Sequence, residues 1–294
     1  MILRRLRLTL EMIKFEHSVF ALPFALTGAL LAWRAGGFDP LHVWRKLLWI
    51  VVAMVGARSA AMAFNRLTDA EIDARNPRTK MRHLPAGHLS TGFTWAFVLV
   101  SALLFLLAAF ELNRLCLELA PAALALIFFY SFTKRFTSLS HLVLGLCLGI
   151  APAAAWIAIE GSLDARILLL TAAVTFWTAG FDVIYSCQDY AFDCAEGLWS
   201  VPRVWGIAGG LRLARLLHSL MIACLLALVY TLHLGPLAVA GTAAVAAMLV
   251  YEHRLVKSGD LSRVNAAFFT MNGYASVLFF LFWAADIFLF QPSV

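Results

Sequence analysis

The sequence contains few charged residues. Only 14% of its 294 residues are Asp, Glu, Lys or Arg, whereas 62% are hydrophobic. A soluble domain has about 25% charged and about 45–50% apolar residues, so this composition excludes a soluble protein. The five cysteines show no C-x-x-C spacing, which argues against a zinc site or a disulfide framework. We also expect no cleavable signal, because the basic N-terminus leads into an apolar run of full spanning length.

Long apolar segments dominate the chain instead. A membrane-spanning helix needs about 20 mostly apolar residues. We therefore predict an all-α polytopic membrane protein, with a bundle of nine transmembrane helices in a single domain over residues 1–294. Only the connections 65–92 and 183–211 are expected to be long loops. The expected spans are 15–34, 43–64, 93–112, 114–132, 139–159, 165–182, 212–233, 235–251 and 266–290.

Lys and Arg gather in alternate connections. If the N-terminus is cytoplasmic, 17 of the 23 basic residues fall on the cytoplasmic side and 5 on the other, with Arg58 inside a span. This bias follows the positive-inside rule. We predict a multi-pass protein of the cell inner membrane, with its N-terminus and both long loops in the cytoplasm. The net charge of +6 then requires no nucleic-acid partner, and no obligate protein partner is evident.

Two acidic motifs follow two of the expected spans. Asn65, Asp69 and Asp73 are four residues apart, and Asp189 and Asp193 repeat that interval. At about 100° per residue, side chains four apart line one face of a helix. Carboxylates are hard oxygen ligands of the kind Mg²⁺ prefers, and protein-bound Mg²⁺ commonly bridges to substrate phosphates. The motifs therefore predict a magnesium–phosphate site with the four aspartates as metal ligands.

Ionisable residues at membrane depth are functional candidates, because burying them in lipid is costly. Asp182 lies within an apolar run, and Arg58 lies seven residues before Asn65 on the same helix face. Arg58 is expected to pair with an anion, either the nearby carboxylates or a bound ligand. Tyr185 lies one turn from both Asp182 and Asp189, which makes it a third candidate.

Basic residues near the motifs are candidates for binding a diphosphate, because guanidinium and ammonium groups neutralise a leaving phosphate. We assign Arg78, Arg82 and Lys134 to this role. Lys80 and Arg135 are explained equally well by anchoring at the cytoplasmic membrane face.

Membrane anchoring or helix packing is an alternative to a catalytic role for the other polar residues. Lys14, Glu16 and His17 lie near the expected interface, and their roles stay open between anchoring there and lining a substrate pocket. Asn272 is expected to pack between helices.

The motifs resemble those of the UbiA family of intramembrane prenyltransferases. The family's first motif, N-x-x-x-D-x-x-x-D, occurs at residues 65–73, and its second, Y-x-x-Q-D-x-x-x-D, at 185–193. The R-T-x-x-R-x-L-P run of its quinone-pathway members occurs at 78–85, with His83 where Pro is common. The run YSFTKR at 130–135 is similar to the family's basic fourth-helix end. The resemblance covers nearly the whole chain.

This resemblance implies an activity. A UbiA enzyme would use Mg²⁺ to transfer a polyprenyl group from polyprenyl diphosphate to an aromatic hydroxy-acid in ubiquinone or menaquinone biosynthesis. Residues 14–25 and 180–193 are similar to a branch of 4-hydroxybenzoate polyprenyltransferase-like enzymes, some of which use a dihydroxynaphthoate. Asn65 would assist the metal ligands, Arg58 would orient the acceptor carboxylate or a phosphate, and Asp182 would give electrostatic or proton-accepting support. Trp199 stands where close relatives have His, so its role stays open.

Two alternatives stay open at this point. One is another UbiA-type reaction, such as haem farnesylation, which would also release diphosphate. The other is a polytopic transporter that uses the intramembrane Asp182 and Arg58. Transporter sites tend toward the membrane midplane, whereas these acidic residues cluster at one interface.

Overall fold

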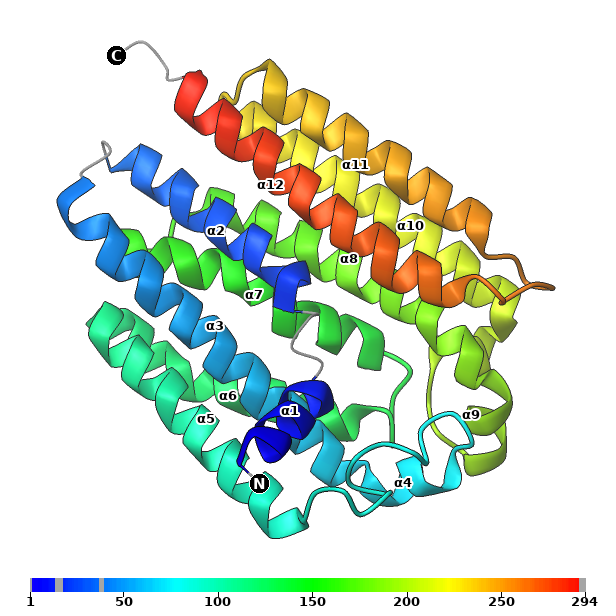
Figure 1. The fold of residues 1–294 in the computed structure, drawn as a ribbon. Coiled ribbons are helices and arrows are strands. Elements are labelled where there is room, and N and C mark those ends of the chain that lie inside the picture. The colour runs from blue at the N-terminus through cyan, green and yellow to red at the C-terminus, as the bar shows by residue number, and fades with distance from the viewer. Residues whose placement is uncertain (1, 14–17, 37–39, 291–294) are drawn as a thin grey trace. The chain divides into compact units, whose positions relative to one another are not determined.

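The computed structural model describes residues 2–13, 18–36 and 40–290, and its regular elements in this part of the chain are helices (Figure 1). Eight of the described helices are long and apolar enough to cross a membrane. The all-helical membrane class is therefore confirmed. The first expected span starts outside the described residues, which also exclude Lys14, Glu16 and His17. From Ser18 to Ala35 the chain forms helix α2. The count of nine spans and the orientation stay predictions.

The chain forms two compact units, which we describe separately. The first unit comprises residues 1–18 and 48–132, and the second comprises residues 19–47 and 133–294. Helices α2 and α3 (Pro40–Thr68) each contribute residues to both units.

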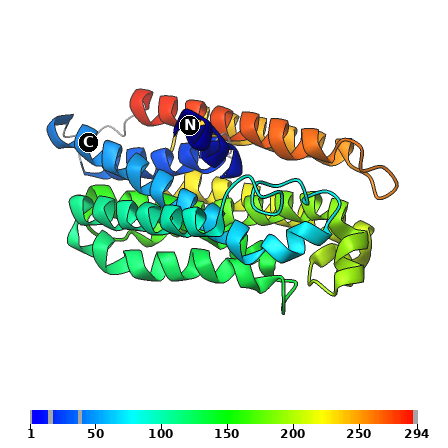
Figure 2. The ribbon, with the colours of Figure 1, turned by 60° about the horizontal axis from the view of Figure 1, so that its bottom comes forward.

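The first unit contains four more helices and a turn-rich segment. They are α1 (Ile2–Met12), α4 (Ala70–Arg75), α5 (Thr91–Leu112) and α6 (Arg114–Thr133). Between α4 and α5, residues 76–90 run as turns (Figure 2), and Ser90 caps α5 by accepting a hydrogen bond from the Phe93 N–H. Phe64 on α3 packs against Trp95 on α5 and Phe128 on α6. These aromatic contacts fix the end of α3 that leads into the first acidic motif.

The second unit is built around α8 (Leu168–Ser186). This helix packs between α7 (Ser140–Glu160) and α10 (Val201–Thr231). Helix α11 (Pro236–Leu255) packs on α10 and on α12 (Asn272–Leu289), as Figure 1 shows. The core is apolar and includes Trp177, which lies 5.0 Å from Phe24 between ring centroids. Buried aromatic surface of this kind stabilises the arrangement of helices that carries the second motif.

One predicted loop was wrong. Residues 183–211 are mostly helical, because α8 continues to Ser186, η3 (Cys187–Asp189) and α9 (Tyr190–Glu196) follow, and α10 begins at Val201. The polar residues of this segment lower its hydropathy, but low hydropathy excludes only a lipid-facing span and not a helix. Gly206 then kinks α10, with φ of 68°, a backbone conformation that favours glycine.

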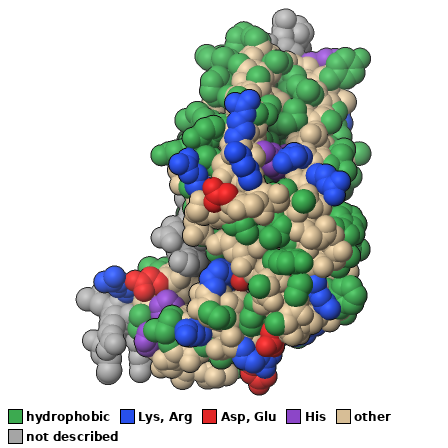
Figure 3. All heavy atoms as spheres, turned by 90° about the vertical axis from the view of Figure 1, so that its right-hand side faces the viewer, with side chains coloured by type: hydrophobic (Ala, Val, Ile, Leu, Met, Phe, Trp, Pro, Cys, Tyr) green, Lys and Arg blue, Asp and Glu red, His purple; other side chains and the backbone are tan. Residues whose placement is uncertain are grey.

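Basic residues of the second unit that we predicted to be cytoplasmic are at its surface. Lys and Arg side chains appear among hydrophobic ones on the face drawn in Figure 3. The exposed basic residues of this group are Arg135, Arg212, Arg215, Arg254, Lys257 and Arg263.

Candidate active site

The first acidic motif begins inside α3 and ends inside α4. The chain bends at Asp69, whose φ and ψ are −96° and 1°, but helical main-chain hydrogen bonds continue from Asp69 N to Asn65 O and from Asp73 N to Asp69 O. Asn65 Nδ2 donates to Asp69 Oδ2 at 3.1 Å. The predicted common face is therefore confirmed for Asn65 and Asp69.

Asp73 is held by the segment that follows it. Arg82 NH1 donates to both Asp73 carboxylate oxygens, at 2.7 and 2.8 Å. Thr79 Oγ1 donates to the Asp73 main-chain oxygen at 3.1 Å, and Asn76 Oδ1 accepts from the Arg78 N–H at 2.9 Å. These turn contacts fold residues 76–82 back over α4. Arg82, predicted to bind a diphosphate, is thereby placed beside a buried carboxylate.

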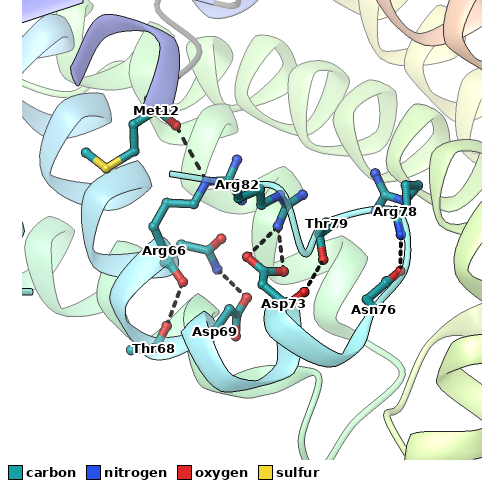
Figure 4. Close-up of polar contacts among 10 residues, drawn as sticks. Met12, Arg66, Thr68, Asp69, Asp73, Asn76, Arg78, Thr79 and Arg82 are labelled. Atoms are coloured by element: carbon teal, nitrogen blue, oxygen red, sulfur yellow. Dashed lines mark hydrogen bonds and ion pairs between the residues drawn. The ribbon is translucent and has the colours of Figure 1, made fainter. Parts of the chain in front are cut away.

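Two other arginines belong to the first unit's α3. Arg66, which the sequence analysis did not single out, is buried, and its Nε lies 3.5 Å from Met12 O (Figure 4). Its position directly after Asn65, the first residue of the acidic motif, was the feature of the sequence that could have identified it. Arg58 lies two turns earlier, and its buried Nε has no hydrogen-bond acceptor among the described residues. Buried cations are normally paired, so this Nε is suited to an anionic ligand.

The second motif repeats the backbone of the first. Asp189 lies between a membrane helix and the short helix α9, and its φ and ψ of −94° and 4° nearly equal those of Asp69. Asp193 is buried one turn later. Gly197 ends α9 with φ of 73°, and Ser200 caps α10.

Lys134 lies on the same side of the second unit as this motif. The Trp199 N–H donates to Lys134 O at 2.7 Å, in the short connection between α9 and α10. The Arg203 guanidinium covers the Trp199 ring at 4.9 Å from its centroid. Trp199 therefore ties Lys134 to the connection after Asp193 within the second unit.

Asp182 lies within α8 and not ahead of a loop. His141 Nδ1 is 2.7 Å from Asp182 Oδ2, and His141 Nε2 accepts from the Val201 N–H at 3.3 Å. The His141 side chain is buried, whereas the Asp182 side chain is 20% exposed. Sequence reasoning missed His141, which is 41 residues away in the chain.

Tyr185 packs against aromatic side chains of a π-helical segment, η4 (Ala266–Met271). Its ring centroid lies 4.2 Å from that of Phe268 and 5.9 Å from that of Phe269. Asn272 fixes this segment, since its Nδ2 donates to Phe268 O and to Glu252 Oε1 on α11. Asn272 thus connects helices, as predicted.

The donor set fits Mg²⁺. Within the described part of the chain, no three His, Cys, Asp or Glu side chains are grouped to hold one metal ion. Mg²⁺ does not need such a cage, because it is commonly bound by one or two carboxylates together with waters and substrate phosphates. Each motif offers two aspartates, and the unpaired Arg58 Nε is complementary to an anion.

Comparisons with known proteins identify the family of this chain. A model of the UbiA prenyltransferase family matches residues 21–283. A 4-hydroxybenzoate octaprenyltransferase from Edwardsiella ictaluri is 32% identical over 254 residues, covering 85% of each chain. Another from Photobacterium profundum is 31% identical over 256 residues, covering 84% of each.

Solved structures show the same fold. A UbiA homolog from Aeropyrum pernix K1, solved in its apo form, superposes with a TM-score of 0.83 at 34% identity, covering 92% of this chain and 98% of that one. A homolog from Archaeoglobus fulgidus, bound to geranyl diphosphate (GPP) and Mg²⁺, has a TM-score of 0.72 at 19% identity, covering 96% and 100%.

The helical membrane fold and the paired aspartate motifs define an intramembrane enzyme of isoprenoid transfer. The chain belongs to the UbiA prenyltransferase family, and it is a prenyltransferase.

Proposed function

We propose that this enzyme transfers a polyprenyl group from polyprenyl diphosphate to an aromatic hydroxy-acid, with Mg²⁺ as its cofactor, in quinone biosynthesis. The observation that carries this proposal is the repeated aspartate motif, in which Asp69 and Asp189 have nearly the same backbone conformation. The proposal includes a single catalytic domain over residues 1–294, located in the inner membrane with its active site facing the cytoplasm.

The relatives favour 4-hydroxybenzoate as the acceptor. The curated relatives described above are named 4-hydroxybenzoate octaprenyltransferase, which supports this acid over a dihydroxynaphthoate or a haem. The donor and the metal are supported by the Archaeoglobus fulgidus homologs, which bind dimethylallyl diphosphate (DMAPP) or GPP together with Mg²⁺. Family membership speaks against the transporter alternative.

In this proposal the acidic residues hold the cation and the basic residues neutralise the donor. Asp69, Asp73, Asp189 and Asp193 are the metal ligands, assisted by Asn65. Bound Mg²⁺ would offset the negative charge of the diphosphate. The other charges come from Arg78, Arg82 and Lys134, which stabilise the diphosphate as it leaves.

In this proposal, Arg82 would exchange its hydrogen bonds with Asp73 for contacts with the diphosphate. Both oxygens of Asp73 accept hydrogen bonds from Arg82, so a cation held by Asp73 would compete with this pair, and the Arg82 guanidinium would then be available to a phosphate. Arg58 then orients the acceptor carboxylate or a phosphate, which would supply the anion that its buried Nε lacks.

Tyr185 and the apolar helices keep water from the reacting carbon. Tyr185 belongs to an aromatic cluster with Phe181, Phe268 and Phe269. Aromatic faces are weakly negative and attract cations, so this cluster is suited to shelter an allylic cation.

The test is a transfer assay with the full chain in detergent. Labelled polyprenyl diphosphate and Mg²⁺ are supplied with 4-hydroxybenzoate or 1,4-dihydroxy-6-naphthoate, and wild type is compared with Asp69→Ala and Asp189→Ala. We expect label to enter 4-hydroxybenzoate, and to be lost in both variants and after chelation of the metal. Metal-independent transfer, or no transfer by folded wild type to either acid, would refute the proposal.

A further inference from the structure

We infer that His141 is a positioning residue that orients the Asp182 carboxylate to accept the proton that the aromatic ring loses during prenyl transfer. The inference rests on the proposed function and assigns its proton acceptor. It also gives a role to His141, whose contacts lie on α7, α8 and α10 of the second unit.

The two hydrogen bonds of His141 fix its tautomer. A main-chain N–H can only donate, so Nε2, which faces the Val201 N–H at 3.3 Å, must present a lone pair. The ring hydrogen therefore lies on Nδ1, which donates to Asp182 Oδ2 at 2.7 Å. A second proton on Nε2 would face the Val201 N–H. The ring therefore accepts from Val201 at Nε2 and donates to Asp182 from Nδ1.

Close packing of two helices fixes this pair in space. Gly145 and Gly149 of α7 face α8, where an added Cβ would collide with Thr175. His141 lies one turn before Gly145, and Asp182 lies about two turns after Thr175. Small residues therefore bring the two backbones together, so that the short imidazole reaches the carboxylate.

Asp182 keeps one oxygen available. Oδ2 accepts from His141, whereas Oδ1 has no hydrogen-bond donor in the described part of the chain. The side chain is 20% exposed, so a ligand can reach it. Oδ1 is therefore the oxygen of Asp182 that can accept a proton, and His141 is the group that orients the carboxylate.

The reaction balances with this assignment. The C–O bond of the donor breaks, and its electron pair leaves with the diphosphate. The ring carbon ortho to the hydroxyl forms the new C–C bond with a π electron pair. The C–H bond at that carbon then breaks, its electron pair restores the aromatic ring, and the proton passes to Asp182 Oδ1. Water later removes this proton, and His141 keeps its own throughout.

The experiment measures a kinetic isotope effect, using 4-hydroxybenzoate with deuterium at both positions ortho to the hydroxyl. In Asp182→Asn we expect kcat to fall by about 10²-fold, the range for loss of a general base, with the donor KM unchanged. In His141→Leu we expect a fall of about 10- to 100-fold, the range for loss of a supporting hydrogen bond. Both variants should show a primary isotope effect larger than that of wild type, because proton loss becomes rate-limiting.

His141→Gln is the matched conservative variant. Its amide has one donor and one acceptor in the same 1,3 relation as the imidazole nitrogens, so it can bond both Asp182 and Val201. We expect it to restore most of the rate and to remove the enlarged isotope effect. A merely structural role for His141 would not move the isotope effect.

The outcomes separate this inference from the proposed function. If wild type transfers the prenyl group but the variants slow without any change in isotope effect, the inference is overturned and the function stands. If His141→Leu does not fold, Asp182→Asn and His141→Gln decide the question by the same isotope measurement. If folded wild type transfers nothing to the acid, the proposed function falls, and this inference falls with it.

Discussion

The two aspartate motifs have the same backbone but different support. Asp69 and Asp189 both stand at a bend between a membrane helix and a short helix, with φ and ψ within a few degrees of each other. In the first motif, the partners of the acidic residues come from nearby in the chain, since Asn65 is four residues from Asp69 and Arg82 is nine from Asp73. In the second region, Asp193 has a hydrogen bond with nearby Ser200, whereas Asp182, which precedes the motif, contacts His141 from 41 residues away.

The two regions differ in the range of their supporting contacts. Asp73 is held by the guanidinium of Arg82, from the turn that follows it. Asp182 is held by the imidazole of His141, on a neighbouring helix that packs closely against its own. Under the proposed function, both motifs would bind the diphosphate through the metal, and Asp182 would accept the proton of the acceptor ring.

The largest expected effect is the loss of prenyl transfer when either aspartate motif loses a carboxylate. It tests whether the two motifs contribute equally to binding the prenyl donor. Asp69→Asn and Asp189→Asn each remove one carboxylate charge without changing side-chain size. We expect each to lower transfer by roughly 10²- to 10³-fold, the range for losing a preorganised electrostatic group. The measurement is the rate of label transfer at saturating Mg²⁺. Near-normal transfer in only one of the two variants would show that the two motifs do not contribute equally to donor binding.

The next effect tests the helix packing behind the second region. Gly145→Ala would force α7 from α8, because its Cβ would meet Thr175 O, and we expect a loss of about 2–3 kcal/mol in stability from overpacking. Gly92→Ala is the control, since nothing lies within 4 Å of a Cβ there. Thermal unfolding in detergent, followed by circular dichroism, compares the two. Equal unfolding midpoints would show that the packing does not position His141.

A third prediction tests the cation of the first motif. Arg82→Gln removes the pair to Asp73, whose side chain is only 6% exposed. We expect a loss of about 2 kcal/mol in unfolding free energy, typical of hydrogen bonds to a charged group. Lys80→Gln, at an exposed position, should stay within about 0.5 kcal/mol. Denaturant unfolding without metal measures both, and an unchanged Arg82→Gln would mean that the pair gives no net stability.

The smallest effect concerns the tautomer of His141. Val201→Pro removes the N–H that faces Nε2, while Ser200 is already extended (φ −140°, ψ 159°), as a residue before proline prefers, and proline suits the first helical position. Loss of one hydrogen bond is worth about 1 kcal/mol, so we expect about a fivefold lower kcat, together with a lower unfolding midpoint because Val201 is buried. A larger fall in kcat than in His141→Leu would contradict the inference that the Val201 hydrogen bond acts only through His141.

Several features of the site could be predicted because they are local. Asn65 and Asp69 share a face and are hydrogen-bonded, since four residues make about one helical turn. The role of Asn272 in joining helices followed from its place in an apolar span, and it bonds Glu252. The segment 183–211 was predicted as a loop because hydropathy responds to polarity, whereas the helices there depend on caps and packing.

The sequence by itself determined the membrane class, the helical segments and the residue types of both motifs, because composition and periodicity are properties of the chain alone. Only the tertiary structure decided that His141 reaches Asp182, that Lys134 lies beside Trp199 and that Phe268 packs on Tyr185. Each of these contacts joins residues far apart in the chain. They depend on where helices approach closely, and that depends on small residues such as Gly145 fitting a particular partner surface.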